Sequence, residues 1–247
     1  MDLLPPDPDL PLIHNRIYDV RVFKKDDATL LVRGAVRDVK PAGLFIEDDP
    51  DPITVHHMVV ELSVTFPMLE IVDVNVVFET HPHGLCPSII EHYDELVGIS
   101  IARGFTHRVR ELFGGPRGCT HTTALLQAMA PAVVQSTFSM RVLAMREMTA
   151  ASGRSADAMP IAASPEQRRQ MYAHNLNSCH VWDEDGEWVA AIERGDAVEQ
   201  PLWITDRLVE LGRGPVQVAR DARGATSERV IHRAARSFDV AFARAGG

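Results

Sequence analysis

The sequence lacks the features that mark membrane and secreted proteins. It contains no apolar run of roughly eighteen residues, the length that a membrane-spanning helix requires. Residues 1–11 are acidic and rich in proline, whereas a secretory signal peptide is basic and then apolar. We therefore expect a cytoplasmic protein that does not contact a membrane.

Basic residues are also too few for a nucleic-acid-binding protein. The 25 lysines and arginines are outnumbered by 34 acidic residues, which gives a formal net charge of -9. No basic segment is interleaved with aromatic side chains, which are 6% of the chain. Because such a charge repels a polyanion, we expect no nucleic-acid partner.

Cysteine is scarce, and the common nucleotide and hydrolase motifs are absent. The three cysteines are widely spaced and odd in number, so a disulfide framework is not expected. No GxSxG, HExxH or GxGxxG motif occurs, and the glycine-rich segment 114–118 lacks the Lys-Ser/Thr ending of a P-loop. The sequence therefore indicates neither a nucleotide site nor a redox cofactor.

What the chain does contain is a pattern of alternating strands in its first third. Residues 16–23 and 29–39 alternate apolar and polar side chains and predict a hairpin, with Val36 and Val39 facing the core. Residues 53–65 and 69–79 are rich in β-branched side chains and predict a second hairpin. The fold class expected is α+β, an antiparallel β-meander packed on one face by helices.

After residue 80 the pattern becomes helical. The longest predicted helix, residues 120–149, is apolar almost all round and should be the central core helix, kinked at Pro131. We expect an extended arm at 1–15, an α+β core domain at 16–195 and a helical carboxy-terminal extension at 196–247 that packs on the core. The other segments expected are helices at 87–97, 105–113, 165–173, 202–211 and 227–243, and a hairpin at 181–192.

The glycine-rich turn at 114–118 is followed directly by Cys119 and His121, which are expected at the start of the long helix. A thiol at a helix amino terminus has a lowered pKa, because the helix dipole favours its anion, and it can act as a nucleophile or a metal ligand. Thiols and imidazoles are the ligands that zinc and iron prefer. One candidate metal set is therefore Cys86, Cys119, His121 and Cys179, although cysteines are equally common as buried core residues.

Histidine and arginine supply the candidate acid-base and anion-binding groups. His56 and His57 are adjacent on a predicted strand, so they point to opposite faces of the sheet. The inward one would be oriented as a general base by Glu61 or Asp73. Arg117 could bind a carboxylate or phenolate bidentately, or it could form a surface salt bridge.

Several short motifs resemble those of a bacterial family of unknown function, domain of unknown function 2889. The resemblance covers roughly residues 30–195, and its most specific part is the GCTH element at 118–121. A more distant likeness is to the scaffold proteins of iron-sulfur cluster assembly, which implies an α+β fold and cysteine ligands at Cys86 and Cys119. The motifs are Ile71-Val72-Asp73, Cys86-Pro87, Leu96-Val97-Gly98, Gly104-Phe105, Arg117-Gly118-Cys119-Thr120-His121 and Cys179-His180.

Together these features predict a small-molecule enzyme of the lyase, decarboxylase or isomerase type, which uses histidine acid-base chemistry on an aromatic or acyl substrate. The alternatives are a metal-binding or iron-sulfur-scaffold-like protein that binds one zinc or iron, and a non-catalytic binding module. We also expect a homodimer. The predicted catalytic residues are His57, His83, His121 and Arg117, and the predicted substrate-binding residues are His56, His81, Met58, Phe78 and Trp182.

Overall fold

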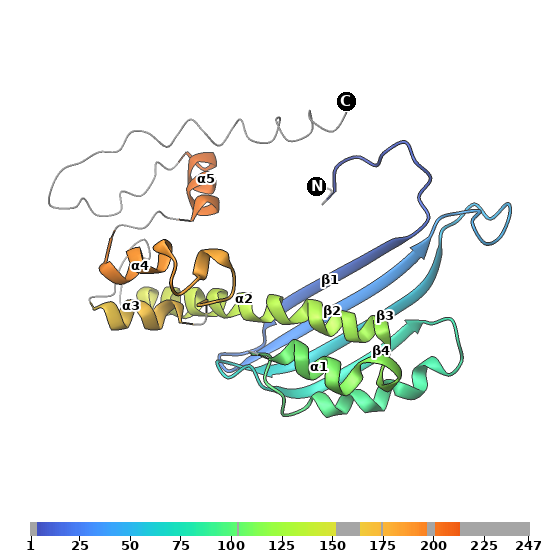
Figure 1. Ribbon diagram of the computed structural model, residues 1–247, viewed down its shortest axis with the longest axis horizontal. Coiled ribbons are helices and arrows are strands. Elements are labelled where there is room, and N and C mark those ends of the chain that lie inside the picture. Colours follow the sequence, from blue (N-terminus) through green and yellow to red (C-terminus); the bar gives the residue numbers. More distant parts are fainter. Residues whose placement is uncertain (1–3, 103, 152–163, 174, 197–200, 213–247) are drawn as a thin grey trace. The chain divides into compact units, whose positions relative to one another are not determined.

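The computed structural model describes residues 4–102, 104–151, 164–173, 175–196 and 201–212 (Figure 1). The chain divides into two compact units, residues 1–158 and 159–247. The expected domain 16–195 extends across the boundary between these units. Within the described residues, no helix is long and apolar enough to cross a membrane.

The first unit is built on a four-stranded antiparallel sheet, as the alternating pattern predicts. The strands follow one another in space in their sequence order. Buried and exposed side chains alternate along β2, so one face of the sheet faces the core. The strands are β1 (Asn15–Lys24), β2 (Thr29–Lys40), β3 (Ile53–Thr65) and β4 (Ile71–Thr80).

Helical segments cover one face of this sheet (Figure 1). The segment predicted as a helix at 87–97 is the 3-10 helix η1 (Cys86–Leu96), and it is followed by α1 (Phe105–Phe113), the short turn η2 (Gly115–Arg117) and α2 (Thr120–Ala151). The helix remains continuous through Pro131. The predicted α+β class with a long helix is therefore confirmed.

Helix α2 lies close to the sheet because β2 has a glycine at the crossing point. A Cβ atom on Gly34 would lie 2.6 Å from Met129 Sδ and 3.2 Å from Leu125 Cδ1. Both of these α2 side chains are fully buried. The missing side chain therefore allows the helix to pack its amino-terminal half against the strands that carry the candidate site.

The described residues of the second unit are helical in large part, and one prediction within them is wrong. Residues 181–192 do not form a hairpin but contain η3 (His180–Trp182) and α4 (Glu187–Arg194). Alanines in the middle, Glu187 in the first turn and Arg194 in the last turn favour a helix there. Helices α3 (Pro165–Tyr172) and α5 (Leu202–Glu210) match the predictions, and the predicted helix at 227–243 lies outside the described residues.

One prediction about the inward face of β2 also needs correction. Val36 is fully buried, as expected, but Val39 is only partly buried and Asp38 occupies the inward position instead. The period of two places Val36 and Asp38 on the same face, and a β-bulge between Asp38 and Val39 interrupts the register. A carboxylate therefore lies among core positions.

Candidate functional site

The site centres on Asp38, a carboxylate whose side chain is only 2% exposed. Its neighbours across the sheet are Arg16 on β1 and His56 on β3, so three adjacent strands place their side chains in one row. The β-bulge lies directly beside this row. Bulges often occur next to active sites, because they re-aim side chains out of the regular pleat.

The Asp38 carboxylate accepts two parallel hydrogen bonds from one edge of the planar Arg16 guanidinium. Arg16 Nε lies 2.6 Å from Asp38 Oδ1, and Arg16 Nη2 lies 2.7 Å from Oδ2. His14 Nε2 approaches Oδ1 at 3.5 Å. This bidentate pairing fixes the plane and position of the carboxylate.

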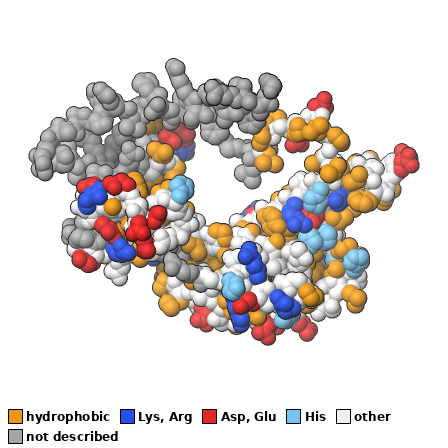
Figure 2. Space-filling view, in the orientation of Figure 1, with side chains coloured by type: hydrophobic (Ala, Val, Ile, Leu, Met, Phe, Trp, Pro, Cys, Tyr) orange, Lys and Arg blue, Asp and Glu red, His pale blue; other side chains and the backbone are white. Residues whose placement is uncertain are grey.

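The same carboxylate contacts two further imidazoles. His56 Nδ1 lies 3.1 Å from Asp38 Oδ2, and His121 Nε2 lies 3.0 Å from the same oxygen. The two rings stack with their centroids 3.8 Å apart. Figure 2 shows histidine and basic side chains gathered over one end of the sheet. We call Arg16, Asp38, His56 and His121 the Asp38 cluster.

Hydrogen bonding, burial and neighbouring charges shift the pKa values of Asp38 and His121. Hydrogen bonds from Arg16 hold the pKa of Asp38 well below its usual range, although burial opposes this shift. Burial lowers the pKa of His121, and the neighbouring His56 lowers it further. At neutral pH we therefore expect an ionised Asp38 beside a neutral His121.

This protonation state also assigns the tautomer of His121. An ionised carboxylate can only accept hydrogen bonds, so the nitrogen that faces Asp38 must carry the proton. That nitrogen is Nε2, which leaves the lone pair on Nδ1. His121 therefore presents a basic nitrogen on the side away from Asp38.

The glycine-rich turn positions Cys119 and His121 at the start of α2. Gly118 passes so close to α1 that a Cβ atom there would lie 2.5 Å from Phe113 O. The Thr123 hydroxyl donates to the same carbonyl oxygen at 3.0 Å. The fully buried Tyr93 hydroxyl accepts the Cys119 N–H at 2.8 Å. Contacts from η1 and α1 therefore fix the beginning of α2.

Cys119 lies beside the free nitrogen of His121. Its Sγ is 3.8 Å from His121 Nδ1, and its side chain is partly buried against the core. The imidazole thus contacts the thiol through Nδ1 and the carboxylate through Nε2. Such an arrangement can move a proton between a thiol and a base that the carboxylate orients.

The predicted catalytic residues are only partly brought together. His121 belongs to the Asp38 cluster, but His57 is on the opposite face of the sheet from His56. His83 is exposed, and its backbone oxygen contacts His81 Nδ1 at 3.0 Å. The Arg117 guanidinium donates to the backbone oxygens of residues 110 and 111. These hydrogen bonds therefore link the glycine-rich turn to the last part of α1.

The structure does not bring the predicted substrate-binding residues together in one place. His56 is the inward histidine, and its carboxylate partner is Asp38 rather than Glu61 or Asp73. Glu61 instead pairs with Arg33, and Asp73 is exposed. Met58 and Phe78 are cross-strand neighbours buried in the core. Trp182 belongs to the second unit, where its ring stacks on Tyr172.

The three cysteines are all free thiols with different surroundings. Cys86 is partly buried against the core of the first unit, and Cys179 is exposed in the second unit. Within the described part of the chain, the group of side chains able to share a metal ion is Asp38, His56 and His121. Their ligand atoms all lie within 4.8 Å of one another. This group shares only His121 with the predicted cysteine-based set.

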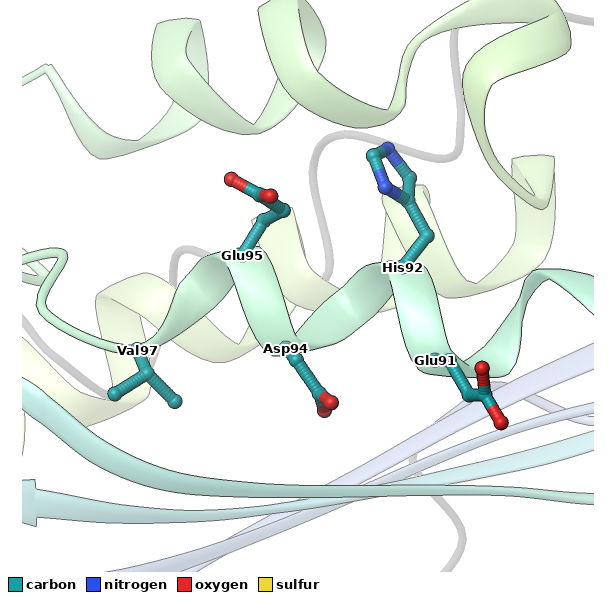
Figure 3. Close-up of a pocket in the computed structure, with 5 residues that line it drawn as sticks. All are labelled: Glu91, His92, Asp94, Glu95 and Val97. Atoms are coloured by element: carbon teal, nitrogen blue, oxygen red, sulfur yellow. The ribbon is translucent and has the colours of Figure 1, made fainter.

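Two surface pockets lie outside the Asp38 cluster. One, of about 490 Å³, runs along η1, where the side chains of Glu95 and His92 point to one side and those of Glu91 and Asp94 to the other (Figure 3). The other, of about 180 Å³, lies at the start of α2 and is lined in part by Thr120, the residue after Cys119. The second pocket therefore adjoins the helix start that carries the thiol.

Sequence reasoning missed Asp38, Arg16 and Tyr93. Asp38 could have been found, because a strict period of two from Val32 and Val36 places it on the inward face. A charged residue at a core position indicates a paired or functional group. The partnership of Arg16 with Asp38 depends on strand register, and that of Tyr93 with Cys119 on helix packing, so neither is visible in the sequence.

Comparisons with known proteins support one of the two resemblances. No curated protein and no solved structure matches the chain, so the likeness to iron-sulfur scaffold proteins has no support there. The matched segment contains every member of the Asp38 cluster as well as Cys119. Residues 14–135 match the family described as a protein of unknown function (DUF2889), which supports placing this part of the chain in that family.

Proposed function

We propose that this protein is a small-molecule enzyme in which His121 transfers a proton to or from its substrate. The reaction is of the lyase, decarboxylase or isomerase type, and the substrate is an aromatic or acyl compound. The observation that carries the proposal is the hydrogen bond between His121 Nε2 and the buried, arginine-bound carboxylate of Asp38. That bond orients the imidazole and leaves Nδ1 as the base.

The surroundings of His121 suit a base at neutral pH. Burial and the adjacent His56 lower its pKa, so the neutral form predominates under physiological conditions. When His121 accepts a proton, Asp38 stabilises the resulting imidazolium across a 3.0 Å hydrogen bond. Arg16 keeps Asp38 ionised and fixed in place during this step.

A direct test compares His121→Ala with His57→Ala. A panel of aromatic and acyl carboxylic acids is incubated in D₂O, and NMR follows deuterium incorporation and loss of carbon dioxide. We expect His121→Ala to lower the rate about 10²- to 10⁴-fold, the usual contribution of a general base. His57→Ala, on the opposite face of the sheet, should keep the wild-type rate.

The pH dependence of the same reaction provides a second test of His121 as the base. The rate should fall as pH drops through the pKa of His121, because protonation removes the lone pair on Nδ1. That pKa should lie below the usual histidine value of about 6.5. The groups that interact with the ring are Asp38, His56, Arg16 and Cys119. An unchanged rate in His121→Ala would refute the proposal.

A metal-dependent site is the second candidate function. Two imidazoles and one carboxylate with converging ligand atoms form a set that zinc and non-haem iron use. The bidentate contact with Arg16 opposes this use, because it occupies both carboxylate oxygens and adds a positive charge. The proton-transfer function therefore fits the geometry better.

Metal analysis distinguishes the two candidates. We expect purified protein, after incubation with zinc or ferrous iron and desalting, to retain less than one equivalent of metal. Elemental analysis of wild type, His56→Ala and His57→Ala provides the measurement. Stoichiometric metal that is lost only in His56→Ala would favour the metal-dependent enzyme.

The expected homodimer and the expected cytoplasmic location stay predictions.

A further inference from the structure

Cys119, His121 and Asp38 form a continuous chain of contacts that starts at a thiol and ends at a carboxylate. Cys119 Sγ lies 3.8 Å from His121 Nδ1, and His121 Nε2 lies 3.0 Å from Asp38 Oδ2. The imidazole uses a different nitrogen for each neighbour. A nucleophile, a base and a group that orients the base, in this order, make up the arrangement that activates thiols and hydroxyls in covalent catalysis.

The direction of proton transfer follows from the tautomer of His121. Because Nε2 carries the proton that bonds to Asp38, Nδ1 has a lone pair that faces Cys119. The thiol proton can therefore move to Nδ1. The imidazolium produced keeps its hydrogen bond to Asp38, and the negative charge of the Asp38 carboxylate stabilises the imidazolium.

Cys119 lies at the start of the helix α2. The Thr123 N–H bonds to Cys119 O, so the hydrogen bonding of α2 begins at Cys119. The first N–H groups of a helix have no partner within it, and the positive end of the helix dipole lies there. Tyr93 fixes the residue by accepting its backbone N–H at 2.8 Å. Cys119 is therefore held in place beside backbone N–H groups that have no partner within the helix.

We infer that Cys119 is a nucleophile that attacks activated acyl compounds, namely esters or thioesters. The inference rests on the proposed role of His121 as a proton acceptor. A carbonyl carbon is the electrophile that suits this site, because its oxygen becomes negative during attack. The N–H groups of Thr120 and His121, at the start of α2, are the donors that would stabilise such an oxyanion.

The reaction requires only water as a second reactant. Cys119 gives its proton to His121 Nδ1, and Sγ forms a bond to the carbonyl carbon. The bond to the leaving group breaks, and the leaving alcohol or thiol takes the proton from His121. Water then attacks the thioester, again with His121 as the base, and releases the carboxylic acid and the Cys119 thiol.

Thiol reactivity tests the inference without knowledge of the natural substrate. Wild-type protein is treated with iodoacetamide at pH 7, and mass spectrometry of peptides measures the alkylation rate of each cysteine. Cys179 is the control because it is exposed, and Cys86 because it is also partly buried. We expect Cys119 to react about tenfold faster than Cys179, since His121 Nδ1 lies 3.8 Å from its Sγ and can accept the thiol proton.

An acyl probe then tests the covalent step. We expect p-nitrophenyl acetate to acetylate Cys119 and to release p-nitrophenol in a burst, followed by slower turnover. His121→Ala should lower the burst rate at least about tenfold, and Cys119→Ala should abolish acetylation at this position. Acetylation at Cys179, or a Cys119 that alkylates no faster than Cys179, would overturn the inference.

The two proposals for this site can fail separately. If His121→Ala loses the proton transfer at carbon while Cys119 of the wild-type protein is neither acetylated nor alkylated faster than Cys179, His121 is the base but Cys119 is not a nucleophile. If His121→Ala changes neither the exchange reaction nor the acetylation burst, both proposals are wrong. Circular dichroism of each variant establishes that it is folded, and the alkylation of wild-type protein requires no variant.

Discussion

Replacing Asp38 by asparagine should destabilise the protein by about 3 kcal/mol and lower its activity about 10³- to 10⁴-fold. Breaking a partly buried ion pair is costly, because the bidentate contact is lost and the charge on Arg16 has no partner at Asp38. The amide also offers N–H groups, which can make His121 accept rather than donate at Nε2. The proton would then move to Nδ1, and the base would face the wrong way.

The destabilisation should depend on pH in a defined direction. The folded-state pKa of Asp38 is lowered by Arg16, so this group stabilises the fold fully at pH values above its unfolded pKa of about 3.9. The stabilisation is lost as the pH falls below that value toward the folded pKa. Wild type and Asp38→Asn should therefore differ most at neutral pH and converge in acid.

Urea denaturation at pH 7, 4 and 3 measures this difference. The matched control is Asp73→Asn, because Asp73 is an exposed aspartate on β4 of the same sheet. We expect the control to change the free energy of unfolding by less than about 0.5 kcal/mol. A difference between Asp38→Asn and wild type that grows in acid would contradict the lowered pKa.

Replacing Gly118 by alanine should destabilise the protein by about 2–3 kcal/mol and abolish the thiol reactivity expected of Cys119. An added Cβ would lie 2.5 Å from Phe113 O and 2.9 Å from Phe113 Cβ. Neither atom is the end of a flexible side chain, so the turn itself must move. Because Cys119 is the next residue, the shift should separate its thiol from His121.

Gly115 in the same turn provides the matched control. Its φ angle is +61°, but no atom lies near the position of an added Cβ. Gly115→Ala should therefore cost only the strain of a left-handed backbone, about 1 kcal/mol. Thermal unfolding and iodoacetamide alkylation of both variants distinguish the effect of overlap with Phe113 from that of backbone strain. Equal effects in the two variants would show that overlap with Phe113 is not decisive.

The secondary structure of the first unit was predictable because its patterns are local. Strands β1 and β2 follow from the alternation of apolar and polar side chains, and β3 and β4 follow from their β-branched residues. Helix α2 follows from a long apolar segment that begins after the glycine-rich turn. The error at residues 181–192 has a local cause as well. An acidic turn ending in Gly186 suits both a hairpin and the approach to a helix.

The sequence by itself determined the α+β class and the delivery of Cys119 and His121 to a helix start. Only the tertiary structure decided which partners they meet, because Asp38 and His121 are 83 residues apart in the chain. Strand register places Arg16, Asp38 and His56 in one row, and Gly34 allows α2 to pack close to the sheet. Register and packing depend on long-range contacts, which local sequence patterns do not contain.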